Sequence, residues 1–234
     1  MEEIRRQDLV DLDNLYPGVP VSSDSVLPRT TCRIIRRIYD NALFMNLDEI
    51  VIDEGYGKCD SARAIASILE DRLPIPVRRT RNVSSEGRGT PVSDSALALR
   101  EKVEMILSDF VRPVERSVIA EPHPAVAVWG VPCSDFLLYD LFPDGTKILG
   151  WTRCFENRTP ADDELEQMID PAVPTVFFAQ MFCHKNALAK HLAGVHGGLY
   201  LDIDGQVTLP IRAKVEAFLH FRVGNRERGR REAG

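Results

Sequence analysis

The sequence predicts an α/β fold, organised as a single domain in which a three-layer sandwich surrounds a mixed, mostly parallel sheet. Two observations favour this class. Short apolar segments alternate with segments of helical periodicity around residues 50–80 and again around 175–203, as in βαβ units. The apolar segments 136–142 and 147–154 flank an Asp-Gly pair, which is typical of a β-hairpin and predicts at least one antiparallel pair of strands.

The first part of the chain is expected to form an arm and one βαβ unit. Residues 1–29 are acidic and interrupted by prolines, so they are interpreted as an N-terminal arm. Apolar residues at helical spacing predict a helix over 31–44. A strand at 50–52, a helix over 60–73 and a strand at 75–80 then follow, and the Ser-, Gly- and Arg-rich residues 81–92 are interpreted as a loop.

The α/β domain, which begins at residue 30, is expected to continue to residue 223. A helix over 93–110 precedes extended runs at 117–120 and 125–129 and the hairpin. A short helix begins at 159, and the segments 175–182, 185–196 and 199–203 predict a second βαβ unit. The last helix spans 211–221, and residues 224–234 are expected to be a disordered basic tail.

Composition narrows the class of protein. The 234 residues carry a net charge of −6, which argues against a broad nucleic-acid interface. Five cysteines lie without a Cys-x-x-Cys pair, which favours reduced thiols in the cytoplasm over a disulfide framework. No apolar run approaches the roughly 20 residues needed to span a bilayer, so we expect no membrane contact. We expect a cytoplasmic protein that acts on a small-molecule substrate.

A glycine turn between the first strand and its helix is the candidate cofactor site. Glycines let a ligand approach the backbone, and a helix N-terminus offers unpaired N–H groups. Residues 53–57, Asp-Glu-Gly-Tyr-Gly, resemble the first motif of the Rossmann-like methyltransferases that use S-adenosylmethionine, in which an acidic residue precedes a glycine turn. This resemblance implies that the cofactor lies against Asp53, Glu54, Gly55, Gly57 and Ser61.

Two alternatives to the methyltransferase remain open. Arg78 and Arg79 lie about 20 residues beyond the glycines, where a dinucleotide fold contacts the 2′-phosphate of NADP, so an NADP-dependent oxidoreductase is the first alternative. In the second, the turn is purely structural, and the protein is a non-enzymatic binding or assembly protein that contacts a partner through its arginine-rich loop and tail.

Candidate catalytic residues follow the later strands, because ligands bind at the carboxyl edge of an α/β sheet. Cys183 and His184 offer a nucleophile and its base. Cys133 and Cys154 follow other extended runs, and the thiols either converge on a metal or are small core residues; we predict no metal site. Glu156 belongs to a polar loop that suits substrate contact.

The sequence therefore predicts a small-molecule enzyme, with S-adenosylmethionine-dependent methyl transfer as the favoured reaction. An amide inside an apolar strand needs hydrogen-bond partners, which makes Gln180 a candidate ligand contact. The predicted catalytic residues are Glu156, Cys183 and His184, and the predicted substrate-binding residues are Cys154, Asn157, Arg158 and Gln180.

Overall fold

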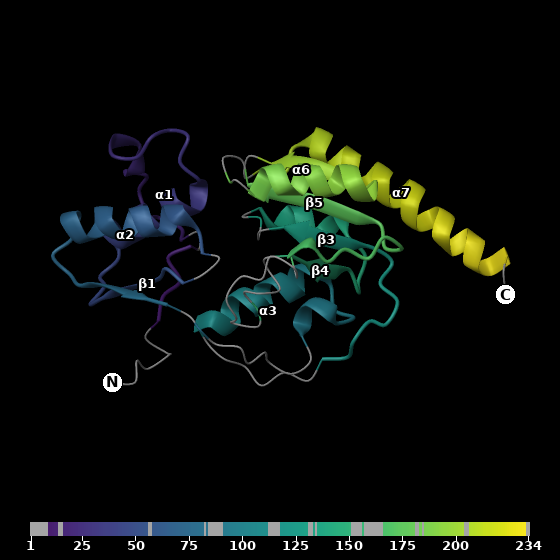
Figure 1. Ribbon diagram of the computed structural model, residues 1–234, viewed down its shortest axis with the longest axis horizontal. Coiled ribbons are helices and arrows are strands. Elements are labelled where there is room, and N and C mark those ends of the chain that lie inside the picture. Colours follow the sequence, from purple (N-terminus) through teal and green to yellow (C-terminus); the bar gives the residue numbers. More distant parts are fainter. Residues whose placement is uncertain are drawn as a thin grey trace.

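The computed structural model shows a mixed α/β protein whose strands form two separate parallel sheets (Figure 1). It describes residues 9–13, 16–55, 58–81, 83, 91–111, 118–130, 133, 135–150, 156, 166–180, 183, 185–203 and 206–232. We call residues 9–81 the N-terminal lobe and residues 91–232 the C-terminal lobe. Each lobe holds one sheet and its own hydrophobic core.

The N-terminal lobe contains the first predicted βαβ unit. Strands β1 (Ile50–Asp53) and β2 (Val77–Thr80) pair in parallel, from Ile50 opposite Val77 to Asp53 opposite Thr80, and α2 (Asp60–Arg72) connects them. The helix α1 (Arg33–Phe44) packs against α2. The buried core of this lobe consists of Leu27, Ile35, Tyr39, Ala42, Ile50, Ile65 and Leu69.

The C-terminal lobe contains a four-stranded parallel sheet in the order β4-β3-β5-β6. Its strands are β3 (Ala127–Gly130), β4 (Lys147–Leu149), β5 (Thr175–Gln180) and β6 (Leu199–Ile203). Strand alternation sends Trp129 and Phe177 to one face, where they pack against α6 (Lys185–His196). The second predicted βαβ unit, β5-α6-β6, is thereby confirmed.

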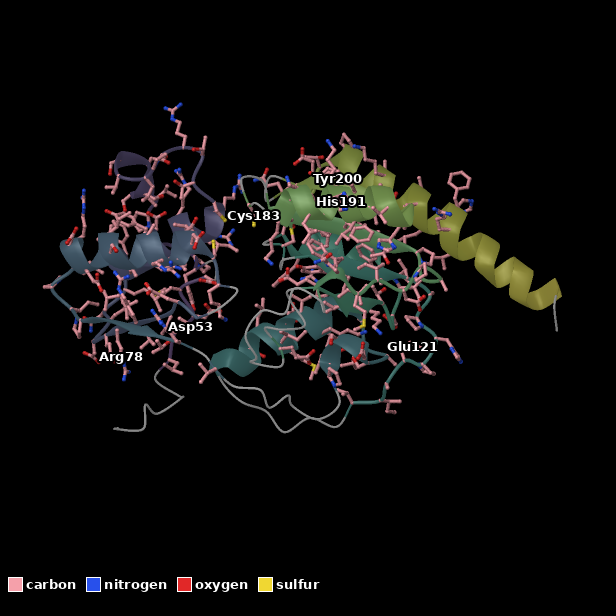
Figure 2. All side chains as sticks on the ribbon, viewed as in Figure 1. Asp53, Arg78, Glu121, Cys183, His191 and Tyr200 are labelled. Atoms are coloured by element: carbon pink, nitrogen blue, oxygen red, sulfur yellow. The ribbon has the colours of Figure 1, made fainter. Side chains whose placement is uncertain are left out.

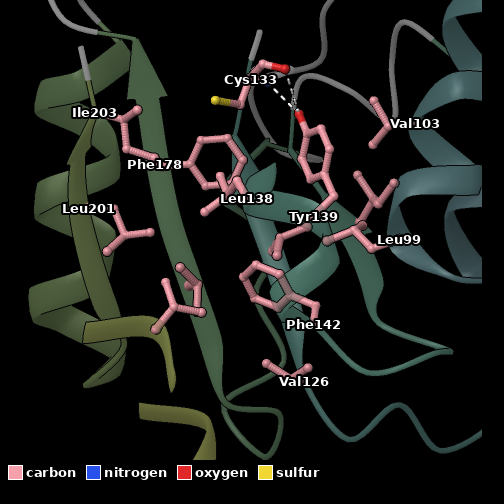
Figure 3. Close-up of a cluster of buried hydrophobic side chains, with 14 of the residues drawn as sticks. Leu99, Val103, Val126, Cys133, Leu138, Tyr139, Phe142, Phe178, Leu201 and Ile203 are labelled. Carbon is pink, nitrogen blue, oxygen red and sulfur yellow. Dashed lines mark hydrogen bonds between the residues drawn. The ribbon is translucent and has the colours of Figure 1, made fainter. Parts of the chain in front are cut away.

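The opposite face of this sheet is covered by three other elements: α3 (Leu99–Val111), the 3-10 helix η4 (Phe136–Leu141) and α7 (Leu209–Glu232). Figure 3 shows side chains of the sheet, such as Phe178 and Leu201, packed with Leu99 and Leu138 from these elements. The hydroxyl of Tyr139 lies inside this core, where it accepts a hydrogen bond from the backbone N–H of Cys133 and donates one to its carbonyl at 3.3 Å.

The predicted hairpin is wrong. Residues 136–141 form the 3-10 helix η4 instead of a strand, and β4 pairs in parallel with β3. The carboxylate of Asp135 caps η4 by accepting the N–H of Leu137 at 3.1 Å, and the helical turn buries Leu138 and Tyr139 together. Among the described strands every ladder is parallel, and a single three-layer sandwich around one mixed sheet is not confirmed.

Two helix boundaries also differ from the sequence prediction. The helix predicted over 93–110 begins at Leu99, because the short 3-10 helix η3 (Val92–Asp94) precedes it. The last helix, α7, continues to Glu232, through residues expected to be a disordered tail, and it extends beyond the sheet (Figure 1). The short helix predicted to begin at 159 lies largely outside the described residues.

The neighbouring strands β3 and β5 approach each other so closely at Gly130 that no side chain fits there. A Cβ atom on Gly130 would lie 2.1 Å from the backbone oxygen of Phe178, which cannot move without breaking the ladder. These two strands are the place where the strand order reverses, since β4 lies on one side of β3 and β5 and β6 on the other. In open α/β sheets ligands bind outside the carboxyl ends of such strands.

We expect Gly130→Ala to lower the free energy of unfolding by about 2–3 kcal/mol, because its methyl group must displace backbone in a packed sheet. Gly194→Ala is the matched control, since nothing lies within 4 Å of a Cβ atom at this position in α6. It should be neutral or slightly stabilising. Urea denaturation of the two variants measures the difference, and equal stability would contradict the close approach at Gly130.

Candidate functional site

A cysteine stands at or just before the start of three helices, α1 and α2 in the N-terminal lobe and α6 in the C-terminal lobe. Cys32 is the N-cap residue of α1, and Cys59 is the N-cap residue of α2, directly after the glycine turn. Cys183 follows β5 and precedes α6, and its carbonyl accepts the N–H of Asn186 at 2.9 Å. Figure 2 shows Cys183 between the two lobes. We call Cys32, Cys59 and Cys183 the thiol cluster.

The charges of the three thiols influence one another. Burial raises the pKa of the Cys183 thiol, and charges on Cys32 and Cys59 raise it further. Burial likewise raises the pKa of Cys32, to which Cys59 contributes. Since charge interactions weaken with distance, Cys59 in the N-terminal lobe and Cys183 in the C-terminal lobe belong to one region.

Cationic side chains lie beside these thiols. The pKa of Arg37 is lowered by burial and by Arg33, whereas Cys133, Asp13 and Cys32 raise it, so this guanidinium is surrounded by groups from both lobes. The ammonium of Lys58 lies 3.3 Å from a carboxylate oxygen of Asp53. Together with three helix N-termini, these cations favour an anionic ligand.

Asp13 is the titratable group of greatest interest at this site. Burial and the nearby charge of Asp11 raise its pKa to about 7, while Arg37 and Lys58 limit the increase. A carboxyl group with a pKa near neutrality suits proton transfer, because both of its protonation states are populated at working pH. We call the set of Asp13, Cys32, Arg37, Lys58, Cys59 and Cys183 the inter-lobe site.

Sequence reasoning missed Asp13, Arg37 and Lys58. The signal available for Asp13 is its spacing of two residues from Asp11 inside the predicted N-terminal arm. The N–H of Asp13 donates to the Asp11 carboxylate at 3.0 Å, so the two acids are held together. Nothing in the local pattern indicates that α1 would bring Arg37 beside them.

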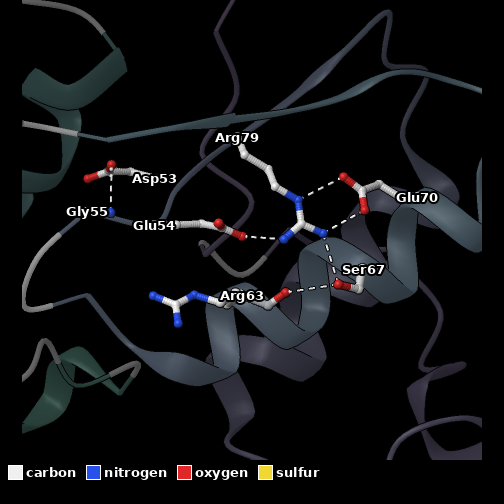
Figure 4. Close-up of polar contacts among 7 residues, drawn as sticks. All are labelled: Asp53, Glu54, Gly55, Arg63, Ser67, Glu70 and Arg79. Atoms are coloured by element: carbon white, nitrogen blue, oxygen red, sulfur yellow. Dashed lines mark hydrogen bonds and ion pairs between the residues drawn. The ribbon is translucent and has the colours of Figure 1, made fainter.

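The predicted cofactor residues Asp53 and Gly55 lie at the carboxyl end of β1, as expected. The carboxylate of Asp53 accepts the N–H of Gly55 at 3.2 Å, which shapes the start of the turn (Figure 4). Ser61 is exposed in the first turn of α2. Gly57 lies outside the described residues.

The two arginines predicted to bind a phosphate, Arg78 and Arg79, form ion pairs with glutamates. Arg79 contacts Glu54 and Glu70, each at 2.6 Å, and Ser67 at 2.9 Å (Figure 4). Arg78 contacts Glu49 at 2.8 Å. Arg79 therefore joins β2 to α2 and to the end of β1, and a phosphate would have to compete with two carboxylates for it.

Glu156, predicted as catalytic, is buried and serves as a backbone anchor. Its carboxylate accepts the N–H of Val92 at 2.5 Å and that of Ser93 at 3.1 Å, which fixes the start of η3. The remaining predicted residues His184, Cys154, Asn157 and Arg158 lie outside the described residues, and only the backbone of Gln180, the last residue of β5, is described. Cys183 is thus the one predicted catalytic residue that the described structure brings to the inter-lobe site.

Comparison with known proteins adds no constraint on the function. No model of a known protein family matches the chain, and no curated protein sequence matches it. None of the described helices is both long and apolar enough to cross a membrane. The described residues also include no group of three His, Cys, Asp or Glu side chains spaced to hold a single metal ion.

The raised pKa of Asp13 predicts a pH dependence of stability. Between pH 3.8 and about pH 7 the carboxyl group of Asp13 is protonated in the folded protein but ionised in the unfolded chain. The free energy of unfolding therefore falls as the pH rises through this range. We expect Asp13→Asn to remove about 2–4 kcal/mol of this fall. Urea denaturation from pH 4 to pH 8 measures it against Asp71→Asn, a change at an exposed position of α2. Parallel profiles for wild type and Asp13→Asn would contradict the assignment.

A second buried charge, Lys102, lies in the C-terminal lobe near Glu156. Its ammonium donates to the carbonyl of Thr146 at 2.7 Å, and its side chain is 0% exposed. Burial lowers the pKa of Lys102 to about 8, although Asp94, Glu121 and Glu156 oppose the change. The protonated form is therefore costly in the folded state.

Because the unfolded chain binds this proton up to a pH of 10.5, stability should rise between about pH 8 and pH 10.5. Lys102→Met should remove a rise of about 2–3 kcal/mol. The control is Lys190→Met, at an exposed position of α6, which should leave the profile unchanged. Guanidinium denaturation across this pH range measures both variants, and a retained rise in Lys102→Met would rule out Lys102 as its origin.

Proposed function

We propose that the protein is a small-molecule enzyme that carries out acid–base chemistry with Asp13 and binds a nucleotide-derived cofactor at the turn between β1 and α2. The observation that carries the proposal is the pKa of about 7 for the partly buried carboxyl group of Asp13, which interacts with Arg37 and Lys58. Structural carboxylates in cation-rich surroundings ordinarily titrate below neutrality, whereas general acids and bases are tuned toward it.

S-adenosylmethionine is the proposed cofactor, and methyl transfer is the proposed reaction. The carboxylate of this cofactor can bind the backbone N–H groups at the N-terminus of α2. Asp53 and Glu54 are the acidic residues that precede the glycine turn, as in the motif that the sequence resembles. S-adenosylmethionine, when bound, would supply the methyl group and depart as S-adenosylhomocysteine, and Asp13 would accept the proton of the acceptor. A base with a pKa near 7 can accept that proton at neutral pH.

The cations of the inter-lobe site support an acceptor that is itself an anion. The charges of Arg37 and Lys58 act on Asp13, and each side chain can donate charge-assisted hydrogen bonds to a carboxylate or phosphate of the acceptor. Four cysteines, Cys32, Cys59, Cys133 and Cys183, are free, which is consistent with the proposed cytoplasmic location.

NADP-dependent oxidoreduction is the less favoured candidate. Arg79 would have to leave Glu54 and Glu70 to bind a 2′-phosphate, which breaks two ion pairs at 2.6 Å. The two candidates therefore differ in the residues on which binding depends. S-adenosylmethionine should depend on Asp53 and the turn, and NADP should depend on Arg79.

The test is thermal unfolding with S-adenosylmethionine, S-adenosylhomocysteine, NADP and ATP added separately. A ligand at about 100 times its Kd stabilises the folded state by about 2.7 kcal/mol, which we expect to raise the Tm by about 5–10 °C for the S-adenosyl compounds. Asp53→Asn should abolish this shift, whereas Arg78→Ala, at an exposed ion pair, should retain it.

A shift with NADP that is lost in Arg79→Ala would replace the methyltransferase with the oxidoreductase. Unchanged Tm with all four ligands would contradict the cofactor proposal and favour a binding or assembly protein. The Asp53→Asn substitution also changes the turn itself. The Tm shift of this variant is therefore measured against the Tm of the same variant without ligand.

A further inference from the structure

The edge strand β6 presents backbone groups that none of the other described strands uses. It is the last strand in the order β4-β3-β5-β6, so it pairs with β5 on one side only. The strand at the opposite edge, β4, is contacted by η3, and Lys147 of β4 forms an ion pair with Asp94 of η3 at 3.4 Å. An unpaired edge is a template on which a further strand can form.

Hydrogen bonding in β5 alternates between its two neighbouring strands. The N–H of Ala127 in β3 donates to the carbonyl of Pro174, the residue before β5, at 2.9 Å. Residues two positions apart in a strand direct their backbone groups to the same side, so Val176 bonds with β3 and Thr175 bonds with β6. The carbonyl of Thr175 agrees with this direction, because its oxygen lies 2.5 Å from the place of a Cβ atom on Gly198, the residue before β6.

The same alternation continues in β6. Leu199, Leu201 and Ile203 direct their N–H and C=O groups to β5, so the N–H and C=O groups of Tyr200 and Asp202 point to the open edge. Among the described residues, no hydrogen bond reaches these backbone groups of Tyr200 and Asp202. The edge therefore offers two donors and two acceptors at the spacing that a further strand requires.

The side chains of β6 are divided between the two faces of the sheet. Leu199, Leu201 and Ile203 pack in the core with α3, η4 and α7 (Figure 3), whereas Tyr200 packs beside α6 and Asp202 is exposed. The order Leu-Tyr-Leu-Asp-Ile alternates apolar and polar residues in the same way from either end. An antiparallel copy of the strand, centred on Leu201, therefore matches apolar with apolar residues on the core side.

We propose that β6 pairs with β6 of a second copy of this chain, antiparallel and centred on Leu201. In this register Tyr200 lies opposite Asp202 of the partner subunit, and each such pair exchanges two N–H···O bonds, because the backbone groups of both residues point outward. The two four-stranded sheets then form one continuous sheet. This inference goes beyond the proposed methyl transfer and uses no residue of the inter-lobe site or the glycine turn.

Charge and exposed apolar surface favour a second copy in this register. Asp202 lies opposite a tyrosine, whereas a shift that pairs Asp202 with Asp202 of the partner subunit brings two carboxylates together. The helices beside β6 also leave apolar side chains in water, since Val195 of α6 and Phe221 of α7 are each 64% exposed. Arg222 donates to the carbonyl of Gly197 at 2.6 Å, which places this part of α7 at the start of β6. A partner at this edge can cover that apolar surface.

The test is sedimentation velocity of the full chain over the micromolar range, where we expect twice the mass of one chain. Asp202→Pro is the deciding variant, because the N–H of Asp202 faces the open edge. Proline removes this donor from the proposed interface and removes no hydrogen bond of the β5–β6 ladder, so we expect a folded monomer with half the mass of the wild type. Asp202→Thr is the matched control, since it keeps the N–H and suits a strand, and it should remain a dimer.

A disulfide measures the register directly. In the proposed pairing the Cα atoms of Tyr200 and Asp202 of the partner subunit lie about 5.5 Å apart, within reach of a disulfide. Tyr200→Cys combined with Asp202→Cys should give a covalent dimer on mild oxidation, seen on a non-reducing gel, when the exposed Cys59 is replaced by serine. Asp202→Cys alone, in the same background, should give none, because no thiol lies opposite it.

Circular dichroism of each variant separates loss of the dimer from loss of the fold. A monomeric wild type would overturn the proposal, and so would a dimer that persists in folded Asp202→Pro, since another surface would then hold it. Equal cross-linking of Asp202→Cys alone and of the cysteine pair would overturn the register. If Asp202→Pro does not fold, the cysteine pair decides the outcome. No ligand is added in these measurements, so this proposal and the proposed cofactor fail independently.

Discussion

The structure depends on one constraint, which is that every described strand pairs in parallel. A parallel strand must be followed by a crossover, and here helices provide it in both βαβ units, β1-α2-β2 and β5-α6-β6. The strands β1 and β5 are therefore each followed by a helix, α2 and α6 respectively. The carboxyl end of β1 leads to Cys59 and that of β5 leads to Cys183, and the charge of Cys59 contributes to the raised pKa of Cys183.

Two ionisable side chains, Asp13 and Lys102, are removed from solvent enough to change their pKa values. Asp13 and Lys102 both have pKa values moved toward neutrality, Asp13 upward and Lys102 downward, and in both cases burial is the main cause. Each charge costs stability in its ionised form. Lys102 is enclosed and hydrogen-bonded to backbone, which indicates a structural role. Asp13 instead interacts with Arg37 and Lys58 beside the thiol cluster, where a proton can be exchanged with a ligand.

Local patterns predicted the βαβ units well, because hydrophobic periodicity defines α1, α2, α6 and strands β1, β5 and β6. The hairpin failed because an Asp-Gly turn between apolar segments fits a 3-10 helix as well as a strand, and only core packing around Tyr139 decides between them. The glycine turn and Cys183 could be found from strand ends. Asp13, Cys32 and Arg37 could not, since their proximity depends on how the arm and α1 fold across the lobe.

The most direct test of the central claim is an NMR titration of the side-chain carboxyl carbon of Asp13 in the folded protein. We expect its pKa to lie near 7 and to rise when Lys58 is replaced by methionine, because the nearby positive charge holds the ionised form in place. A pKa near 4 that does not respond to Lys58→Met would contradict the claim that Asp13 and Lys58 share a site able to transfer protons at neutral pH.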